Sequence, residues 1–206
     1  MIVEYLGIPG CGKTYNKQLY INQLTKEKRE WLDISRWKGM PFYLKLFYKF
    51  SDYSIFLFPK YRRLFKLYKE ACIIKCDTSK YFPLSFDTCL RDIVQASFLH
   101  DFFGNLNCIV INDEGQLQRI VTLAVQYEVN VEDLMSVYLA EKHIEETRFV
   151  EIATDDAFCN IKARNRHDCE MDEINDDMLK NYLNDFDVAC KKCMNLIKTN
   201  ENTISE

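Results

Sequence analysis

One short stretch near the amino terminus carries the residues with the clearest chemistry. Gly7-Ile8-Pro9-Gly10-Cys11-Gly12-Lys13-Thr14 satisfies the pattern G-x-x-x-x-G-K-[ST]. Glycines at this spacing let the backbone curl until several N–H groups face one anion, and the dipole of a following helix points at the same place. Lys13 can reach the β- and γ-phosphates of a nucleotide, and the Thr14 hydroxyl can bind Mg²⁺. The stretch is predicted to be a phosphate-binding loop that uses Gly7, Pro9, Gly10, Cys11, Gly12, Lys13 and Thr14.

A second group of chemically useful residues follows a short apolar run. Residues 106–111 are almost continuously apolar, and Asp113-Glu114-Gly115 comes directly after them. Ligands of parallel sheets sit at the carboxyl ends of strands, so this acidic pair is expected to meet the loop. Asp113 is predicted to hold Mg²⁺, and Glu114 to accept a proton from an attacking hydroxyl or water. Gly115 is expected to leave room for the acceptor or for the loop.

A third candidate group is the basic stretch Cys159-Asn-Ile-Lys-Ala-Arg-Asn-Arg166. Phosphoryl transfer builds negative charge on the moving group, and the planar fork of arginine pairs with two phosphate oxygens. Arg164 and Arg166 are therefore candidates for closing over the transferred phosphoryl group. Basic residues also favour the carboxyl end of any helix, so this segment alone leaves both interpretations open.

The elements needed to hold these groups alternate between strands and helices. Such alternation indicates a three-layer α/β fold around a mostly parallel sheet. Strands are expected at residues 2–6, 31–34, 106–111 and 148–152, with a minimal last strand at 203–205 after a turn at 200–202. Helices are expected at residues 15–28, 131–142, 155–166 and 171–197.

The long segment at about 38–104 has no strong strand pattern and is predicted to be a helical insertion over the nucleotide site. Residues 38–75 carry nine Lys or Arg against two acids, interleaved with many Phe and Tyr. Apolar spacing predicts helices at 42–50 and 61–72, with Pro59 between them, and an amphipathic helix at 84–103. Three roles stay open: a packed cap, peripheral membrane contact through 41–70, or an anion pocket with Arg36, Arg62, Arg63 and Arg91.

Composition narrows the possible classes of protein further. A chain of 206 residues suits one domain, here 1–206, with an insertion and a lid at about 159–170. The net charge of −4 argues against broad nucleic-acid binding, which needs excess Lys and Arg. We see no signal peptide and no apolar run long enough to span a bilayer, so a cytoplasmic location is expected. Whether the chain forms a homo-oligomer is left open.

The cysteines permit one competing hypothesis. His167, Cys169, Cys190 and Cys193 could bind zinc, because Cys190 and Cys193 have the spacing of a zinc knuckle. Only one half of the usual paired signature is present, and the two lysines between these cysteines suit the solvent side of a helix. Small, buried, reduced thiols are the simpler interpretation.

The order of parts resembles the P-loop nucleotide and nucleoside kinases, among which thymidylate kinase has the best-known shape. The matching pieces are the Gly7–Thr14 motif, a long helical region, the strand before Asp113, and the lid-like Ile161–Arg166 stretch. The resemblance implies phosphate binding by Gly12, Lys13 and Thr14, metal binding by Thr14 and Asp113, and lid contacts from Arg164 and Arg166. Thymidylate kinases commonly have Asp-Arg where this chain has Asp113-Glu114, which leaves the acceptor open.

The leading hypothesis is therefore an ATP- and Mg²⁺-dependent kinase that phosphorylates a small molecule. Its catalytic residues would be Lys13, Glu114, Arg164 and Arg166, and the acceptor a nucleoside, a nucleotide, a sugar or a lipid-linked hydroxyl. A P-loop ATPase of motor or assembly type, resembling viral or bacterial AAA-like proteins, is the alternative, since Glu114 could orient water. A third hypothesis is a nucleotide-binding regulatory protein. No motif that reads the base separates ATP from GTP.

Overall fold

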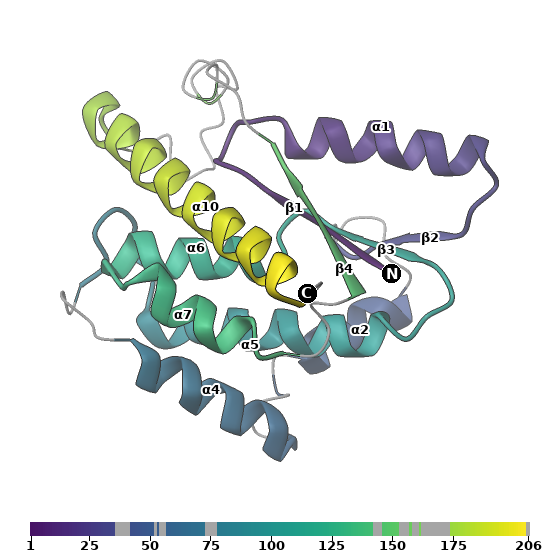
Figure 1. The fold of residues 1–206 in the computed structure, drawn as a ribbon, viewed down its shortest axis with the longest axis horizontal. Coiled ribbons are helices and arrows are strands. Elements are labelled where there is room, and N and C mark those ends of the chain that lie inside the picture. The colour runs from purple at the N-terminus through teal and green to yellow at the C-terminus, as the bar shows by residue number, and fades with distance from the viewer. Residues whose placement is uncertain are drawn as a thin grey trace.

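Four parallel strands form a sheet in the order β2-β3-β1-β4, shown in the computed structural model of Figure 1. The structure describes residues 1–35, 42–51, 53, 57–72, 78–141, 146–152, 157, 161 and 174–204. The strands are β1 (Ile2–Leu6), β2 (Trp31–Asp33), β3 (Ile109–Asn112) and β4 (Thr147–Glu151). All four expected internal strands are therefore present.

The strand order brings the two sequence motifs to one edge of the sheet. β1 pairs with β3 on one side and with β4 on the other, and β2 lies beyond β3. After β1 the chain first forms β2, two positions away, and then returns to form β3 between them. It forms β4 last, on the other side of β1, so the direction in which strands are added reverses at β1. Open parallel sheets bind ligands at such a reversal, beyond the carboxyl ends of the strands. The loop after β1 and the acidic pair after β3 both start there.

One face of the sheet is covered by α1 (Lys13–Lys26). Ile21 and Leu24 of this helix pack on a small apolar cluster of the sheet, made by Val3, Tyr5, Ile109 and Ile111. Burial of these side chains fixes the direction of α1, and therefore of the loop that precedes it.

The opposite face carries the main core. It is covered by α5 (Phe86–Phe103), α6 (Gln116–Tyr127) and α10 (Asp176–Ile204), with α2 (Phe42–Ser51), α4 (Pro59–Ala71) and α7 (Val131–Tyr138) packed outside them. Helix, sheet and helix make the three layers of a P-loop NTPase fold, as the sequence indicates. No described helix is long and apolar enough to cross a membrane.

Two local predictions are wrong and one helix was not predicted. The helix at 84–103 is not amphipathic: α5 lies between other helices, and its side chains from Ile93 to His100 are buried on every side. Helix α6 was not predicted, although its apolar positions Leu117, Ile120 and Val121 recur at helical spacing. The last strand does not exist, because α10 continues through Thr203 and Ile204.

Candidate nucleotide site

The loop after β1 needs glycine at three positions. Gly10 and Gly12 have φ angles of 84° and 92°, in the left-handed region that other residues resist. A Cβ on Gly7 would lie 2.3 Å from the carbonyl oxygen of Ile152, at the end of β4. The glycine spacing of the motif therefore follows from backbone geometry and from close packing against the neighbouring strand.

The Lys13 side chain folds back over its own loop. Its Nζ donates to the carbonyl oxygens of Gly7, at 2.5 Å, and Ile8, at 3.2 Å. Burial lowers the pKa of this ammonium, although negative charge at Asp113 and Glu114 opposes the shift. A phosphate oxygen that replaced the two carbonyls would meet a cation already desolvated and positioned, which strengthens the attraction.

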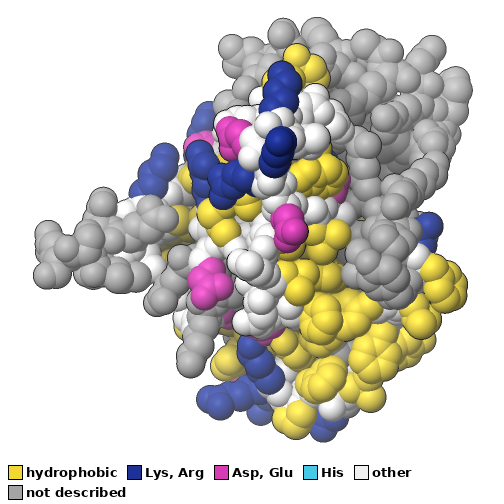
Figure 2. All heavy atoms as spheres, turned by 90° about the vertical axis from the view of Figure 1, so that its right-hand side faces the viewer, with side chains coloured by type: hydrophobic (Ala, Val, Ile, Leu, Met, Phe, Trp, Pro, Cys, Tyr) yellow, Lys and Arg dark blue, Asp and Glu magenta, His cyan; other side chains and the backbone are white. Residues whose placement is uncertain are grey.

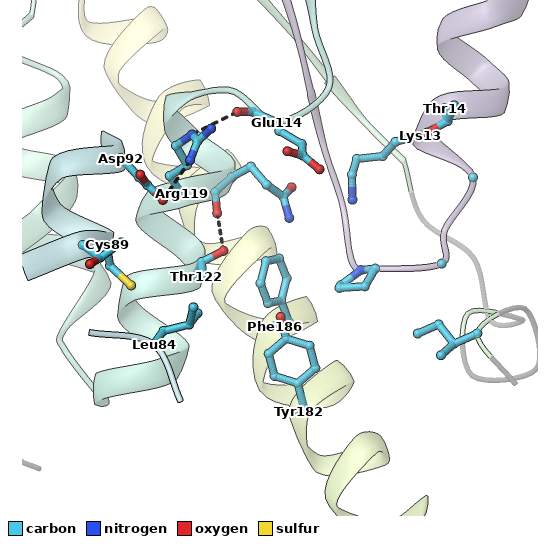
Figure 3. A pocket seen from close by; sticks show the side chains of 16 residues that line it. Lys13, Thr14, Leu84, Cys89, Asp92, Glu114, Arg119, Thr122, Tyr182 and Phe186 are labelled. Carbon is cyan, nitrogen blue, oxygen red and sulfur yellow. Dashed lines mark hydrogen bonds and ion pairs between the residues drawn. The ribbon is translucent and has the colours of Figure 1, made fainter. Parts of the chain in front are cut away.

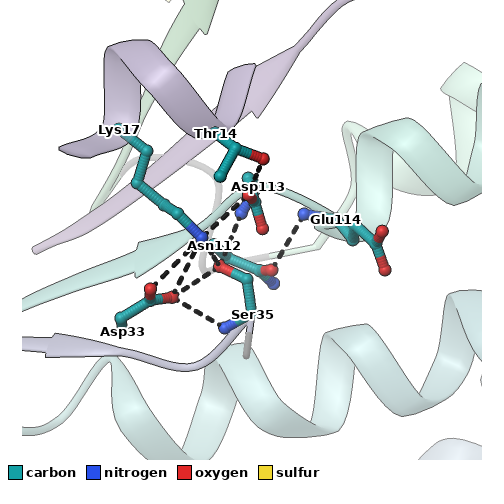
Figure 4. A network of polar contacts seen from close by, with 7 residues as sticks. All are labelled: Thr14, Lys17, Asp33, Ser35, Asn112, Asp113 and Glu114. Carbon is teal, nitrogen blue, oxygen red and sulfur yellow. Dashed lines mark hydrogen bonds and ion pairs between the residues drawn. The ribbon is translucent and has the colours of Figure 1, made fainter. Parts of the chain in front are cut away.

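Asp113 belongs to a buried polar network on the α1 side of the sheet edge (Figure 4). Its Oδ2 accepts from the Thr14 hydroxyl at 3.3 Å and from Lys17 Nζ at 2.8 Å. Lys17 is only 1% exposed and also reaches Asp33 at 3.2 Å and the Ser35 hydroxyl at 3.1 Å. Burial alone would raise the pKa of Asp113, but its contacts with Lys17 and Thr14 hold the pKa below the usual range.

Lys17, Asp33 and Ser35 belong to this site and were not predicted from the sequence. Asp33 ends β2, which is paired with β3, so its carboxylate lies near that of Asp113. Ser35 connects the two: its hydroxyl donates to Asp33 Oδ1 at 2.6 Å and accepts from the backbone N–H of Asp113 at 3.0 Å. Lys17 lies one helical turn after Lys13, and that spacing is the signal that could have revealed it.

The oxygen atoms beside the loop suit a hard divalent cation. The Thr14 hydroxyl and the Asp113 carboxylate face each other, and Mg²⁺ is held by such oxygens together with substrate phosphates and water. Lys17 already neutralises part of the local charge, so the nucleotide itself would supply much of the remaining attraction for the ion. The predicted pair of metal ligands therefore fits Mg²⁺ chemically.

A cavity of about 520 Å³ opens beside the loop (Figure 3). This volume lies within the range of small-molecule sites. Five residues of the predicted loop line it, namely Pro9, Gly10, Gly12, Lys13 and Thr14. From there the cavity extends to the first turns of α5, to α6 and to the middle of α10. It therefore offers space beyond what the phosphates alone would fill.

The polar wall of the cavity comes from α6 and α5. Glu114, which begins the turn into α6, is exposed and lines the cavity, whereas Asp113 does not. Arg119 pairs with Asp92 of α5 at 3.1 Å, and its Nε donates to the Glu114 carbonyl oxygen at 3.2 Å. Gln118 accepts from the Gly7 N–H at 3.4 Å. Arg119 and Gln118 were missed because α6 itself was missed, and Asp92 was missed because its pairing with Arg119 depends on how α5 and α6 pack.

The far end of the cavity is apolar and aromatic. Tyr182 and Phe186 project from α10 with their ring centroids 5.5 Å apart, and Leu84 stands opposite them (Figure 3). Flat apolar surfaces of this kind suit an aromatic ring of a ligand. Neither aromatic residue could be singled out from the sequence, since both also read as ordinary core positions of a helix.

Some expected site residues lie elsewhere. Cys11 is a buried residue of the loop, and Gly7 packs on Ile152, directly after β4. Neither residue lines the cavity. Arg62, Arg63 and Arg91 do not line the cavity, and of the described 42–103 region only Leu84, Thr88, Cys89 and Asp92 do. Arg36, Arg164 and Arg166 lie outside the described residues, as does most of the 159–170 lid. Ile161 is described and lines the cavity.

The zinc hypothesis finds no support in the part of the chain that is described. Cys190 and Cys193 are buried in the core along α10, and burial raises the pKa of both thiols, that of Cys193 to about 12. A raised pKa disfavours the thiolate that zinc requires. No cluster of three or more metal-binding side chains occurs among the described residues, and His167 and Cys169 lie outside them.

A buried carboxylate connects β1 to the acidic turn. Glu4 Oε1 accepts from the Leu117 N–H at 2.6 Å, so it caps the amino terminus of α6. A Cβ on Gly115 would lie 2.2 Å from the Glu4 carboxyl carbon. Gly115 therefore leaves room for Glu4, not for the acceptor or the loop as expected, and the contact fixes where the turn at Asp113 and Glu114 begins.

We expect Glu4→Gln to flatten the dependence of stability on pH. Burial raises the pKa of Glu4 from 4.5 to about 8, despite the hydrogen bond from Leu117. Between these values the folded state binds more protons than the unfolded state, so stability falls as pH rises, by at most about 1.4 kcal/mol per pH unit. Thermal unfolding from pH 5 to 9 measures the slope, with Glu30→Gln as the exposed control. Equal slopes in wild type and Glu4→Gln would contradict this assignment.

The parallel sheet and the Gly7–Thr14 loop together make a three-layer α/β P-loop NTPase fold. Solved structures of deoxyadenosine kinase are similar to the chain. Deoxyadenosine kinase from M. mycoides with bound dATP matches at 15% sequence identity over 100% of both chains, with a TM-score of 0.45. The same enzyme with dCMP and dCDP matches at 16% identity over 100% of this chain and 97% of that chain, with a TM-score of 0.46. No protein-family model matches the chain, and a search of curated protein sequences gave no match.

Proposed function

We propose that this protein transfers the γ-phosphoryl group of ATP to the hydroxyl of a small acceptor, and that the acceptor is a nucleoside. The observation that carries the proposal is the extent of the cavity beside the loop. It begins at Lys13 and Thr14 and continues to Arg119, Tyr182 and Phe186. A protein that only hydrolysed ATP would need space for the ATP molecule and one water. The extra compartment is the place for a second substrate.

The walls of this compartment favour a nucleoside over a plain sugar. The rings of Tyr182 and Phe186 offer an apolar surface for a base, and the paired Arg119 and Asp92 offer hydrogen-bonding groups for its edge or for the ribose. Glu114 lies between this compartment and the loop, where the hydroxyl to be phosphorylated would sit. A hydroxyl acceptor must lose a proton, and a carboxylate at this place can take it.

In the proposed reaction the acceptor oxygen forms a bond to the γ-phosphorus as the bond from that phosphorus to the β,γ-bridging oxygen breaks. The hydroxyl proton passes to Glu114 and from there to water, and ADP leaves. Lys13 moves from the carbonyls of Gly7 and Ile8 to the phosphate oxygens and stabilises their charge. Thr14 and Asp113 would hold Mg²⁺, which would supply positive charge to offset the negative charge of the phosphates.

The 159–170 segment is proposed as a lid of the same 1–206 domain, and the packing of two described residues beside it supports this role. A Cβ on Gly10 would lie 2.7 Å from the carbonyl oxygen of Ala157 and 2.9 Å from Ile161 Cγ1. Ala157 and Ile161 thus lie against the phosphate loop. Arg164 and Arg166 follow within five residues and are proposed to close over the transferred phosphoryl group.

The experiment is a transfer screen with labelled ATP and Mg²⁺ against separate pools of nucleosides, nucleotides and sugars. We expect slow ATP consumption alone and at least about a hundredfold increase with one nucleoside pool, because a bound acceptor replaces water at a positioned γ-phosphate. With the acceptor known, Arg164→Ala should lower turnover far more than ATP affinity. GTP in place of ATP tests the donor.

Phe186→Ala and Phe50→Ala form a matched pair for the screen. Phe186 lines the cavity but is only 1% exposed, so a thermal melt first establishes that Phe186→Ala is folded. Phe50 is 47% exposed on α2 and does not line the cavity. Only Phe186→Ala should raise the KM of the acceptor. ATP consumption that no pool stimulates, but that rises as the protein assembles or meets a polymer, would instead identify an ATPase. Unchanged turnover in Arg164→Ala would exclude the lid assignment.

A further inference from the structure

Helix α2 presents apolar side chains on two sides, and only one of them has a partner among the described residues. Phe47 points inward and packs on the end of α5, with its ring centroid 4.0 Å from Phe102 and 5.5 Å from Phe98. Phe42, Leu46 and Phe50 recur every four residues along the outer side and are 80%, 60% and 47% exposed. The inner contact explains why the helix is held in place. It does not explain the outer stripe.

The outer stripe continues into a larger exposed surface, which we call the α2 patch. Figure 2 shows hydrophobic side chains gathered on this face of the molecule, with Lys and Arg bordering them. The patch consists of Phe42, Leu46, Phe50, Tyr53, Leu57, Phe58, Phe102 and Leu106, each at least 40% exposed. Contiguous exposed apolar surfaces of this kind mark sites where another surface binds.

The charge around the patch identifies the kind of partner. Helix α2 carries Lys45 and Lys49 and no acidic residue. Of the five basic residues of α4, Lys60, Lys66 and Lys69 pair with Asp101, Glu70 and Asp87, and the other two are Arg62 and Arg63. The whole chain nevertheless has a net charge of −4, so this basic character is local. Aromatic and aliphatic side chains bordered by lysine and arginine are typical of helices that lie on anionic lipid.

We propose that the α2 patch docks this protein on an anionic lipid surface. The outer stripe would enter the boundary between headgroups and acyl chains, while the lysines face the headgroup charge. A second copy of the chain fits less well, because a twofold contact through α2 would bring Lys45 and Lys49 of both copies together. The charge thus favours lipid over self-association.

The position of the patch leaves the nucleotide site accessible. Phe102 lies in the last turn of α5, and Leu106 follows that helix, whereas Thr88, Cys89 and Asp92 reach the cavity from its first turns. An 18-residue helix is about 27 Å long, so patch and cavity lie at opposite ends of α5. A docked protein could therefore still exchange nucleotide with solution. The inference does not depend on the proposed transfer reaction.

Sedimentation with vesicles, without nucleotide, tests the proposal. One set of vesicles contains phosphatidylcholine alone, and the other contains phosphatidylcholine with phosphatidylglycerol. We expect the wild type to sediment with the second set and to be released by salt. The double variant Phe42→Ser/Leu46→Ser should bind about tenfold less, because two anchoring side chains are lost. Lys45→Gln/Lys49→Gln should bind less only where phosphatidylglycerol is present.

Leu19→Ser is the matched control, since Leu19 is 50% exposed on α1, across the sheet from the patch. It should bind vesicles like the wild type. If the double variant fails to fold in a thermal melt, the single variant Phe42→Ser gives the same comparison. Wild-type protein that binds neither vesicle, or binds equally after the patch is changed, would overturn the proposal. The proposal would also be overturned if light scattering showed a wild-type dimer, if the patch variants were monomers, and if neither bound vesicles.

Discussion

Replacing Lys13 with alanine should lower kcat/KM for phosphoryl transfer by about a thousandfold or more, equivalent to about 4 kcal/mol of transition-state stabilisation. The Lys13 ammonium is half-buried beside the loop and held by the carbonyl oxygens of Gly7 and Ile8. It is therefore desolvated before the nucleotide arrives, and its attraction for the developing charge is weakly screened. The measurement is steady-state transfer with the acceptor found by the screen, together with ATP binding by calorimetry.

Lys26→Ala is the control for Lys13→Ala, because Lys26 is an exposed lysine in the last turn of the same helix. It should leave transfer unchanged. A thermal melt shows whether loss of the two carbonyl contacts loosens the fold instead. Transfer within tenfold of wild type in a folded Lys13→Ala protein would remove the lysine from the chemistry.

The parts of the fold that could be predicted are those written in local patterns. The Gly7–Thr14 motif specifies a strand, a turn and a helix within a short stretch, and β3 is a continuous apolar run because both of its faces are buried. Strands with such patterns are recognised in isolation. The order of the strands in the sheet was not predicted, because the crossover rules fix the handedness of a connection and not which strands are neighbours.

The parts that could not be predicted depend on contacts between distant segments. The sequence predicts only that Glu4 is a polar position of a strand. In the structure Glu4 caps α6, which begins more than a hundred residues later. Asp33 reads as the end of a weak strand, yet β2 brings it beside Asp113. The helix α5 reads as amphipathic, yet other helices cover its polar positions Gln95 and Ser97. Tertiary packing decides each of these cases.

The buried cation Lys17 gives the second large expected effect. Lys17→Met keeps the length of the side chain but leaves Asp33 and Asp113 close together without a counter-charge. Breaking a buried pair in this way costs about 3–5 kcal/mol, a large share of the stability of an ordinary domain. We therefore expect a much lower unfolding temperature at pH 7, measured by calorimetry. Lowering the pH should restore part of it, because protonation removes the repulsion.

A divalent cation should stabilise the Lys17→Met protein in place of the lost ammonium, since two carboxylates and the Thr14 hydroxyl are oxygen ligands that such ions prefer. Adding Mn²⁺ without nucleotide should raise the unfolding temperature of the variant more than that of the wild type. Lys17→Met/Asp33→Asn removes one of the two charges and should recover most of the lost stability, with little response to Mn²⁺. A Lys17→Met protein as stable as the wild type at pH 7 would show that this network does not hold the strand ends together. The metal site would then have to be explained without it.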